Sequence, residues 1–161
     1  MFREVDVPSA VAGFLFLHSM PGRNESFEDA VAEVRRLGIS QIVSLAPLSE
    51  IRAKSPTYAK AIEAENLPTI LASCPIPDRG VPENRQEFLS SVEETVSALK
   101  VGKKLLLHCG AGIGRTGTYA AAVLMRLGLS KEQSIAEVSR AGSRPETTEQ
   151  LELLNALSQQ A

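Results

Sequence analysis

The chain has 161 residues, of which 43% are hydrophobic and 22% are charged, and its formal net charge is −2. These values predict one soluble domain over residues 1–161, expected as a monomer, and give no support to nucleic acid or a membrane as a partner. Apolar runs are too short to span a bilayer, no secretory signal is recognised, and two cysteines indicate no disulfide framework. We therefore expect a reducing, cytoplasmic location.

The predicted elements alternate between strand and helix along most of the chain. The apolar run 13–20 predicts a strand, and the spacing in 26–37 predicts a helix with Ser26 as N-cap and Gly38 at its end. The later predicted elements are a strand at 39–46, a helix at 56–65, a strand at 67–76, a helix at 83–100, a strand at 103–109 and helices at 116–128, 130–142 and 146–159. This alternation predicts a layered α/β fold.

The stretch LLLHCGAGIGRTG, residues 105–117, joins the last predicted strand to a helix. Gly112, Gly114 and Gly117 match the G-x-G-x-x-G pattern of dinucleotide sites, which is weak on its own. That pattern should be followed by a second strand with an acidic residue, but the region near Glu137 is predicted to be helical. A phosphate loop of the Walker type requires lysine where Thr118 stands. A nucleotide site is therefore disfavoured.

The same stretch also contains the pattern H-C-x5-R-T-G, which is more typical of a site with a cysteine nucleophile. A loop of small residues that opens a helix points backbone N–H groups inward, which favours the thiolate form of Cys109 and binds an anion. Arg115 would grip two phosphate oxygens, and Thr116 could donate its hydroxyl to the Cys109 sulfur. His108 would fix the loop by hydrogen bonding. A buried structural thiol is the alternative for Cys109 alone, but an inward-facing Arg115 needs an anion.

A leaving alkoxide or phenoxide also needs a proton, and Asp78 in PIPDRGVP is the candidate acid. It follows a predicted strand, and flanking prolines restrict where it can point. The alternative is an ordinary turn aspartate. Glu83 is the nearest substitute, whereas Glu87 is assigned to the solvated face of the next helix.

These residues resemble the cysteine-dependent protein tyrosine phosphatase superfamily, in its compact dual-specificity form and most of all the kinase-associated phosphatase group. The resemblance is carried by MPGR, LGISQIVSLAPLSEI, PIPDRGVPEN, HCGAGIGRTG and SKEQSIAEVSRAGSRPETTEQ. It implies a central mixed, mostly parallel sheet flanked by helices on both sides, with no metal or cofactor. It also implies a phosphocysteine on Cys109, phosphate held by Arg115 and the amides of residues 110–115, and Asp78 as acid and then base.

The family often positions the hydrolytic water with a glutamine near the start of the last helix. The segment ETTEQ offers Gln150 for this role, while Glu146 occupies the first slot. The loop interior carries no lysine, and its residues are Gly110, Ala111, Gly112, Ile113 and Gly114. We therefore expect a phosphorylated protein as substrate, with phosphotyrosine ahead of phosphoserine and phosphothreonine. The alternative is a phosphoinositide or another small phosphate ester.

Other residues near these motifs have two interpretations each. Cys74 is interpreted as a small core residue, or else as a thiol that could trap oxidised Cys109 in a disulfide. Arg79 could meet the substrate or lie in solvent, and Arg144 could lie near the phosphate or on a surface loop. Two rival functions are a phosphate-recognition module without turnover and an oxyanion reductase, which would need further thiols close to Cys109.

Overall fold

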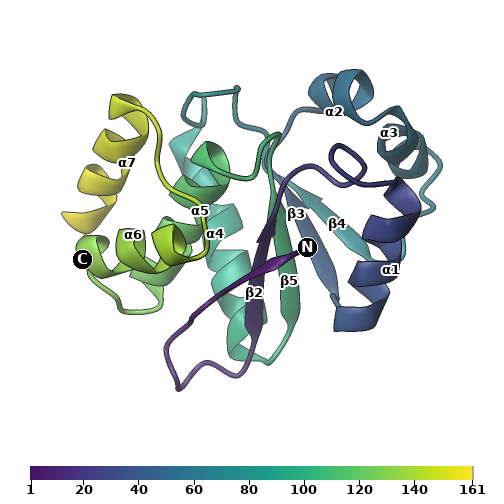
Figure 1. Cartoon of the computed structure of the whole chain (residues 1–161). Helices are drawn as coiled ribbons and strands as arrows, with labels where there is room; N and C mark the ends of the chain where they lie inside the picture. The colour runs from purple at the N-terminus through teal and green to yellow at the C-terminus, as the bar shows by residue number, and fades with distance from the viewer. Residues whose placement is uncertain (161) are drawn as a thin grey trace.

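The computed structural model describes residues 1–160, and Ala161, the last residue of the predicted domain, lies outside them. Figure 1 shows a central sheet with helices on both sides. The strands are β1 (Arg3–Val5), β2 (Phe14–His18), β3 (Gln41–Ser44), β4 (Ile70–Ser73) and β5 (Lys104–His108). The helices are α1 (Phe27–Leu37), α2 (Leu48–Lys54), α3 (Pro56–Glu63), α4 (Arg85–Lys100), α5 (Gly114–Arg126), α6 (Lys131–Arg140) and α7 (Thr148–Ser158).

The sheet is mixed and mostly parallel, as the resemblance implied. Its strand order is β1-β2-β5-β3-β4, with β1 antiparallel to β2 and the other neighbours parallel. Strand β5 lies in the middle, and Leu105, Leu106 and Leu107 are fully buried. A continuous apolar run is expected where a strand is covered on both faces. The predicted α/β class is therefore confirmed.

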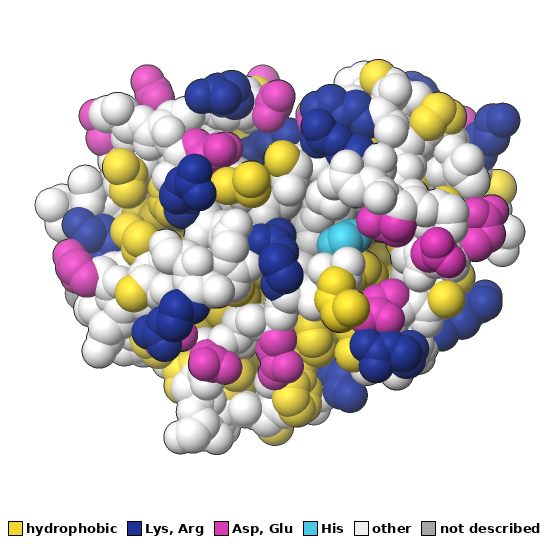
Figure 2. Space-filling view, viewed as in Figure 1, with side chains coloured by type: hydrophobic (Ala, Val, Ile, Leu, Met, Phe, Trp, Pro, Cys, Tyr) yellow, Lys and Arg dark blue, Asp and Glu magenta, His cyan; other side chains and the backbone are white. Residues whose placement is uncertain are grey.

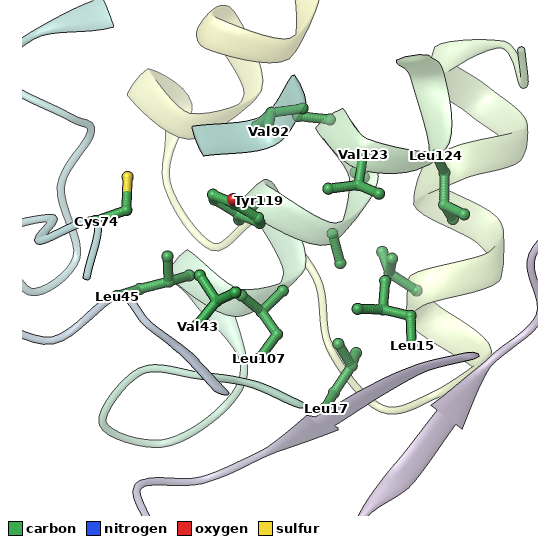
Figure 3. Packing of buried hydrophobic residues seen from close by; sticks show 14 of the residues in the cluster. Leu15, Leu17, Val43, Leu45, Cys74, Val92, Leu107, Tyr119, Val123 and Leu124 are labelled. Carbon is green, nitrogen blue, oxygen red and sulfur yellow. The ribbon is translucent and has the colours of Figure 1, made fainter. Parts of the chain in front are cut away.

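Successive side chains on the strands point to opposite faces, so the sheet has two cores. The larger core faces α4, α5, α6 and α7, and Figure 3 shows Leu15, Leu17, Val43 and Leu107 packed with Tyr119 of α5. The residues between them, Phe16, Ile42 and Leu106, pack on the other face with Val34 of α1. Helices thus cover both faces of the sheet, and β5 is packed between them.

Two elements were not predicted, and the predicted elements differ from the observed ones at their ends. Strand β1 was not predicted, because it has only three residues and buries only Val5. Helix α2 was not predicted either, because it has seven residues, no side-chain N-cap and one buried apolar residue, Ile51. Helix α5 begins at Gly114 instead of residue 116. The tight turn of the preceding loop ends at Gly114, so the helix can begin at this residue despite the low helix propensity of glycine. No helix within residues 1–160 combines the length and apolarity needed to cross a membrane.

The parallel strands β2, β3, β4 and β5 all end at one edge of the sheet, where binding sites of α/β folds form. Backbone hydrogen bonds tie the segments after these strands together. Met20 donates to Gly110, Leu45 donates to His108, and Ile76 donates to Leu45. Residues far apart in the sequence therefore meet around the segment that follows β5.

Candidate active site

The glycine loop, residues 109–115, turns tightly at this edge, and the side chain of Cys109 points into the loop. The sulfur of Cys109 accepts the Gly112 N–H at 3.3 Å, and the residue is only 2% exposed. Gly112 has a φ of 76°, and a Cβ there would lie 2.5 Å from the carbonyl carbon of His18. A glycine is required at this point because any side chain would displace the loop from β2.

The backbone amides of the loop form a cluster of free donors. The N–H groups of Gly110, Ala111, Ile113, Gly114 and Arg115 donate no hydrogen bond to another residue of the described chain. They surround the N-terminus of α5, where the first-turn N–H groups have no partner within the helix and carry partial positive charge. This arrangement is a ready binding site for an anion such as phosphate.

Arg115 lies beside this cluster, with its side chain 2% exposed, and its charge is matched by Glu50. Both carboxylate oxygens of Glu50 accept from the guanidinium at 2.8 Å, and Lys54 adds a third contact at 2.9 Å. These contacts, the Arg115 hydrogen bond above all, lower the pKa of Glu50 to about 2. Burial alone would lower the pKa of Arg115, but Glu50 raises it above its ordinary value. The anion that a buried Arg115 requires is thus already present within the protein.

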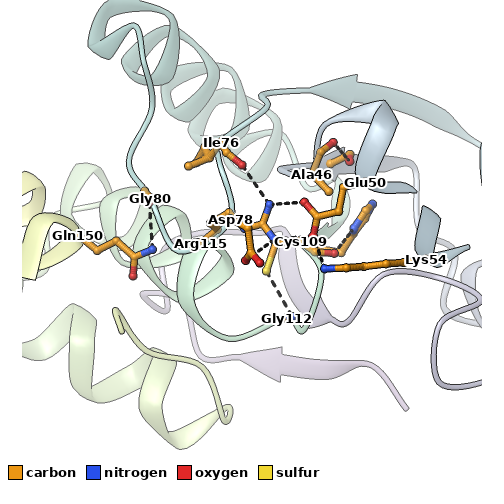
Figure 4. Close-up of polar contacts among 12 residues, drawn as sticks. Ala46, Glu50, Lys54, Ile76, Asp78, Gly80, Cys109, Gly112, Arg115 and Gln150 are labelled. Atoms are coloured by element: carbon orange, nitrogen blue, oxygen red, sulfur yellow. Dashed lines mark hydrogen bonds and ion pairs between the residues drawn. The ribbon is translucent and has the colours of Figure 1, made fainter. Parts of the chain in front are cut away.

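Asp78 reaches the same guanidinium from the segment after β4. Its Oδ1 accepts from Nη2 of Arg115 at 3.0 Å, and the carbonyl of Ile76 accepts from Nη1 at 3.0 Å (Figure 4). The side chain of Asp78 is 62% exposed, so solvent and a substrate can reach its carboxylate. Glu83 instead lines a separate cavity of about 410 Å³ with Cys74. The structure therefore brings Asp78, and not Glu83, to Arg115.

Gln150 lies at the site but has both ends of its amide engaged. It is fully buried, its Oε1 accepts the Glu146 N–H at 2.8 Å, and its Nε2 donates to the Gly80 carbonyl at 3.0 Å. It therefore ties the start of α7 to the segment that carries Asp78. Glu146 is exposed, and its carboxylate lies so close to the Cα of Gly114 that a Cβ at that position would clash with it.

Thr116 is placed differently from the expectation. Its buried hydroxyl has no hydrogen-bond partner among the described residues, so the expected bond to the Cys109 sulfur is not formed. The sulfur is instead directed at the Gly112 N–H.

His108 fixes the loop through the backbone of its neighbour. Its Nδ1 bonds the Cys109 carbonyl at 2.9 Å, and its Nε2 bonds the Tyr58 hydroxyl at 2.9 Å. Burial lowers the pKa of His108 to about 4, so the ring is neutral. The carbonyl can only accept, which assigns the proton to Nδ1 and makes Tyr58 the donor to Nε2. The predicted hydrogen bonding of His108 to the loop is present.

Several residues whose role was open can now be placed. Cys74 is buried, and this burial raises the pKa of its thiol, which fits an inert core position. The Arg79 side chain is exposed and makes no ion pair with another described residue. Arg144 has an exposed side chain, but its backbone N–H donates to the Ile113 carbonyl at 3.1 Å, so this segment braces the loop. Glu50 and Tyr58 were not singled out, although Glu50 lies within one of the segments that carry the resemblance.

Comparisons with known proteins agree with this arrangement. A protein of Invertebrate iridescent virus 3 named as tyrosine phosphatase 067L is 42% identical over 65 residues, covering 38% of this chain and 27% of that protein. Receptor-type tyrosine-protein phosphatase V of Rattus norvegicus is also 42% identical over 65 residues, covering 38% of this chain and 4% of that protein. The chain therefore spans less than a third of the length of these two relatives.

The fold is shared with a solved structure of kinase-associated phosphatase. That structure superposes with a TM-score of 0.85 at 23% identity, covering 99% of this chain and 94% of that chain. The family described as the Swiss Army Knife protein, DSP-PTPase phosphatase domain, matches residues 9–161. Together with the cysteine, the arginine and the amide cluster, this match shows that the chain belongs to the PTP-SAK family of DSP-PTPase phosphatase domains.

Proposed function

We propose that the protein hydrolyses phosphate monoesters on proteins, phosphotyrosine first among them, through a phosphocysteine on Cys109. The observation that carries the proposal is the sulfur of Cys109 inside a loop whose free amides and neighbouring Arg115 can bind a tetrahedral dianion. A non-catalytic recognition module would not need the thiol or Asp78. An oxyanion reductase would need further thiols, whereas Cys74 is buried and lines another cavity.

In the first step, the thiolate of Cys109 attacks phosphorus in line with the leaving oxygen. The S–P bond forms as the P–O bond breaks, and Asp78 gives a proton to the departing oxygen. The free amides bind the equatorial oxygens, and Arg115 joins them with the Nη2 donor that Asp78 releases as it turns to the leaving oxygen. Together they stabilise the charge of the transition state. His108 stays neutral, and its Nδ1–H donates to the Cys109 carbonyl, which fixes the backbone at the start of the loop.

In the second step, water attacks the phosphocysteine and the sulfur leaves as a thiolate. Asp78 accepts the proton from water and so returns to its starting state. Thr116 has a free hydroxyl that could support the leaving sulfur after a rotation. For the water, we favour Glu146 over Gln150, because Gln150 has both ends of its amide engaged, whereas the Glu146 carboxylate lies beside Gly114 of the loop.

The remaining expectations are part of the same proposal. We infer a single catalytic domain, because the five strands of the described chain lie in one sheet, and we expect a monomer in the cytoplasm. The proposed chemistry uses only side chains and amides of this chain, without a metal or cofactor. Figure 2 shows basic and acidic side chains interspersed on the visible face, so this face gives no support to nucleic acid or a membrane as a partner.

The test is hydrolysis of phosphotyrosine, phosphoserine, phosphothreonine and phosphoinositide substrates by the wild type, Cys109→Ser and Asp78→Asn. Cys109→Ser should bind phosphate without turnover, and mass spectrometry of quenched wild type should detect phosphate on Cys109. Asp78→Asn should lose rate mainly on esters with poor leaving groups. Equal rates of Asp78→Asn and wild type on such esters would exclude Asp78 as the acid. Turnover by Cys109→Ser would exclude the phosphocysteine route.

A further inference from the structure

Arg3 of strand β1 reaches the outside of the glycine loop. In the pairing of β1 with β2, Arg3 lies opposite Leu17, one residue before β2 ends at the edge that carries the site. Its Nη2 donates to the Gly112 carbonyl at 2.8 Å, and its Nη1 donates to the Ala141 carbonyl at 2.8 Å and to Ser143 Oγ at 3.2 Å. The Ser143 hydroxyl donates to the same Gly112 carbonyl at 2.6 Å.

We propose that Arg3 is a positioning residue that holds the peptide between Gly112 and Ile113 in the orientation the glycine loop needs to bind an oxyanion. The proposal rests on the proposed function of this loop. It assigns a role to a residue outside the signature segment, about a hundred positions earlier in the chain. Arg3 does not touch the substrate in this proposal, and it acts through the backbone of Gly112.

The geometry of the peptide bond makes this contact consequential. The structure has no cis peptide among its described residues, so the Ile113 N–H points opposite to the Gly112 carbonyl. Because Arg3 and Ser143 fix that carbonyl outward, the Ile113 N–H is directed away from them, and it has no acceptor within residues 1–160. Gly112 has a positive φ and no side chain, so the backbone itself resists rotation of this peptide weakly.

The positive charge of Arg3 also favours anion binding at the glycine loop. Burial lowers the pKa of Arg3, while its attraction to the nearby sulfur of Cys109 opposes that effect. Cys109 also raises the pKa of Arg115, so cations from two separate elements interact electrostatically with Cys109. A cation bonded to the Gly112 carbonyl also polarises the peptide and strengthens its N–H as a donor.

The experiment compares wild type with Arg3→Met and Arg3→Lys, using binding of inorganic vanadate and the pH profile of Cys109 alkylation by iodoacetamide, followed by mass spectrometry. Arg3→Met should weaken vanadate binding about 10- to 100-fold, because the Ile113 N–H would no longer be held toward the anion and a hydrogen bond to a charged group would be lost. Its alkylation midpoint should move to higher pH, because one of the two cations that attract the thiolate is gone. Arg3→Lys keeps the charge, but its single nitrogen cannot occupy both positions from which Nη1 and Nη2 of Arg3 donate. It should therefore bind vanadate more weakly, while its alkylation midpoint stays near the wild-type value.

The matched control is Arg36→Met, which removes an exposed arginine paired with Glu33 and should change neither readout. Wild-type vanadate affinity in folded Arg3→Met would overturn the proposal, as would a loss of thermal stability with both readouts unchanged. If Arg3→Met does not fold, Arg3→Lys decides, and wild-type affinity there would also overturn it. Both readouts are independent of turnover, so a protein that hydrolyses no ester would refute the proposed function without deciding the role of Arg3.

Discussion

Replacing Glu50 by glutamine should destabilise the protein and disable the site together. Glu50 holds both ends of the Arg115 guanidinium, whose side chain is buried to 2% exposure. Glutamine keeps nearly the same shape but has one acceptor oxygen and no charge, so part of the buried cation would be left unpaired. Removing one partner of a buried ion pair is costly, because the other charge stays desolvated.

The magnitude follows from the pKa of Glu50, which falls from 4.5 to about 2 in the folded protein. That difference corresponds to roughly 3 kcal/mol of preferential stabilisation of the carboxylate. Since Glu50 retains some exposure and is screened by solvent, we expect a loss of about 2 kcal/mol in Glu50→Gln. This is a large part of a typical domain stability of about 5 to 15 kcal/mol. The loosened Arg115 should also lower kcat/KM about 10- to 100-fold.

The assay is urea unfolding of wild type and Glu50→Gln at several pH values, with Glu33→Gln as a control in an exposed pair with Arg36. The pKa of Glu50 is lower in the folded than in the unfolded state, so its contribution is complete above about pH 4.5. It should disappear as the pH falls toward about 2, and the difference between wild type and variant should shrink over that range. Equal losses in Glu50→Gln and Glu33→Gln at pH 7, or a difference independent of pH, would refute this reasoning.

Three further predictions test other contacts of the site. Gly112→Ala should distort the glycine loop and lower phosphate affinity at least about 10-fold, because a Cβ would meet the His18 backbone; isothermal titration calorimetry measures this, and unchanged affinity would contradict the tight turn. Tyr58→Phe should cost about 1 to 3 kcal/mol in urea unfolding, because Nε2 of buried His108 loses its donor, and an unchanged midpoint would contradict the stabilising role of this hydrogen bond. Gln150→Leu should slow esters with poor leaving groups more than activated esters, because the segment that carries Asp78 loses its tie to α7, and uniform slowing would count against this role.

The nucleophile site could be predicted from the sequence because its parts are contiguous. Cys109, the glycines of the loop and Arg115 lie within seven residues, so their closeness in space follows from their closeness in the chain. Local rules also predicted helix α1, where Ser26 caps the start and Gly38 ends it in the left-handed conformation. Strands β2, β3, β4 and β5 were predicted from apolar and β-branched runs, with ends that differ by one to three residues, whereas β1 was not predicted.

The partners of the site were decided only by the tertiary structure. Glu50, Tyr58 and Arg3 lie 65, 50 and 109 positions from the residues they contact, so no local pattern marks them. They meet Arg115, His108 and Gly112 because parallel strands end at one edge of the sheet, and β1 adds Arg3 at its margin. Sequence alone therefore determined the reactive loop, since its chemistry resides in adjacent backbone groups. Strand order determined which charges neutralise and orient that loop, since charge pairing depends on distance in space.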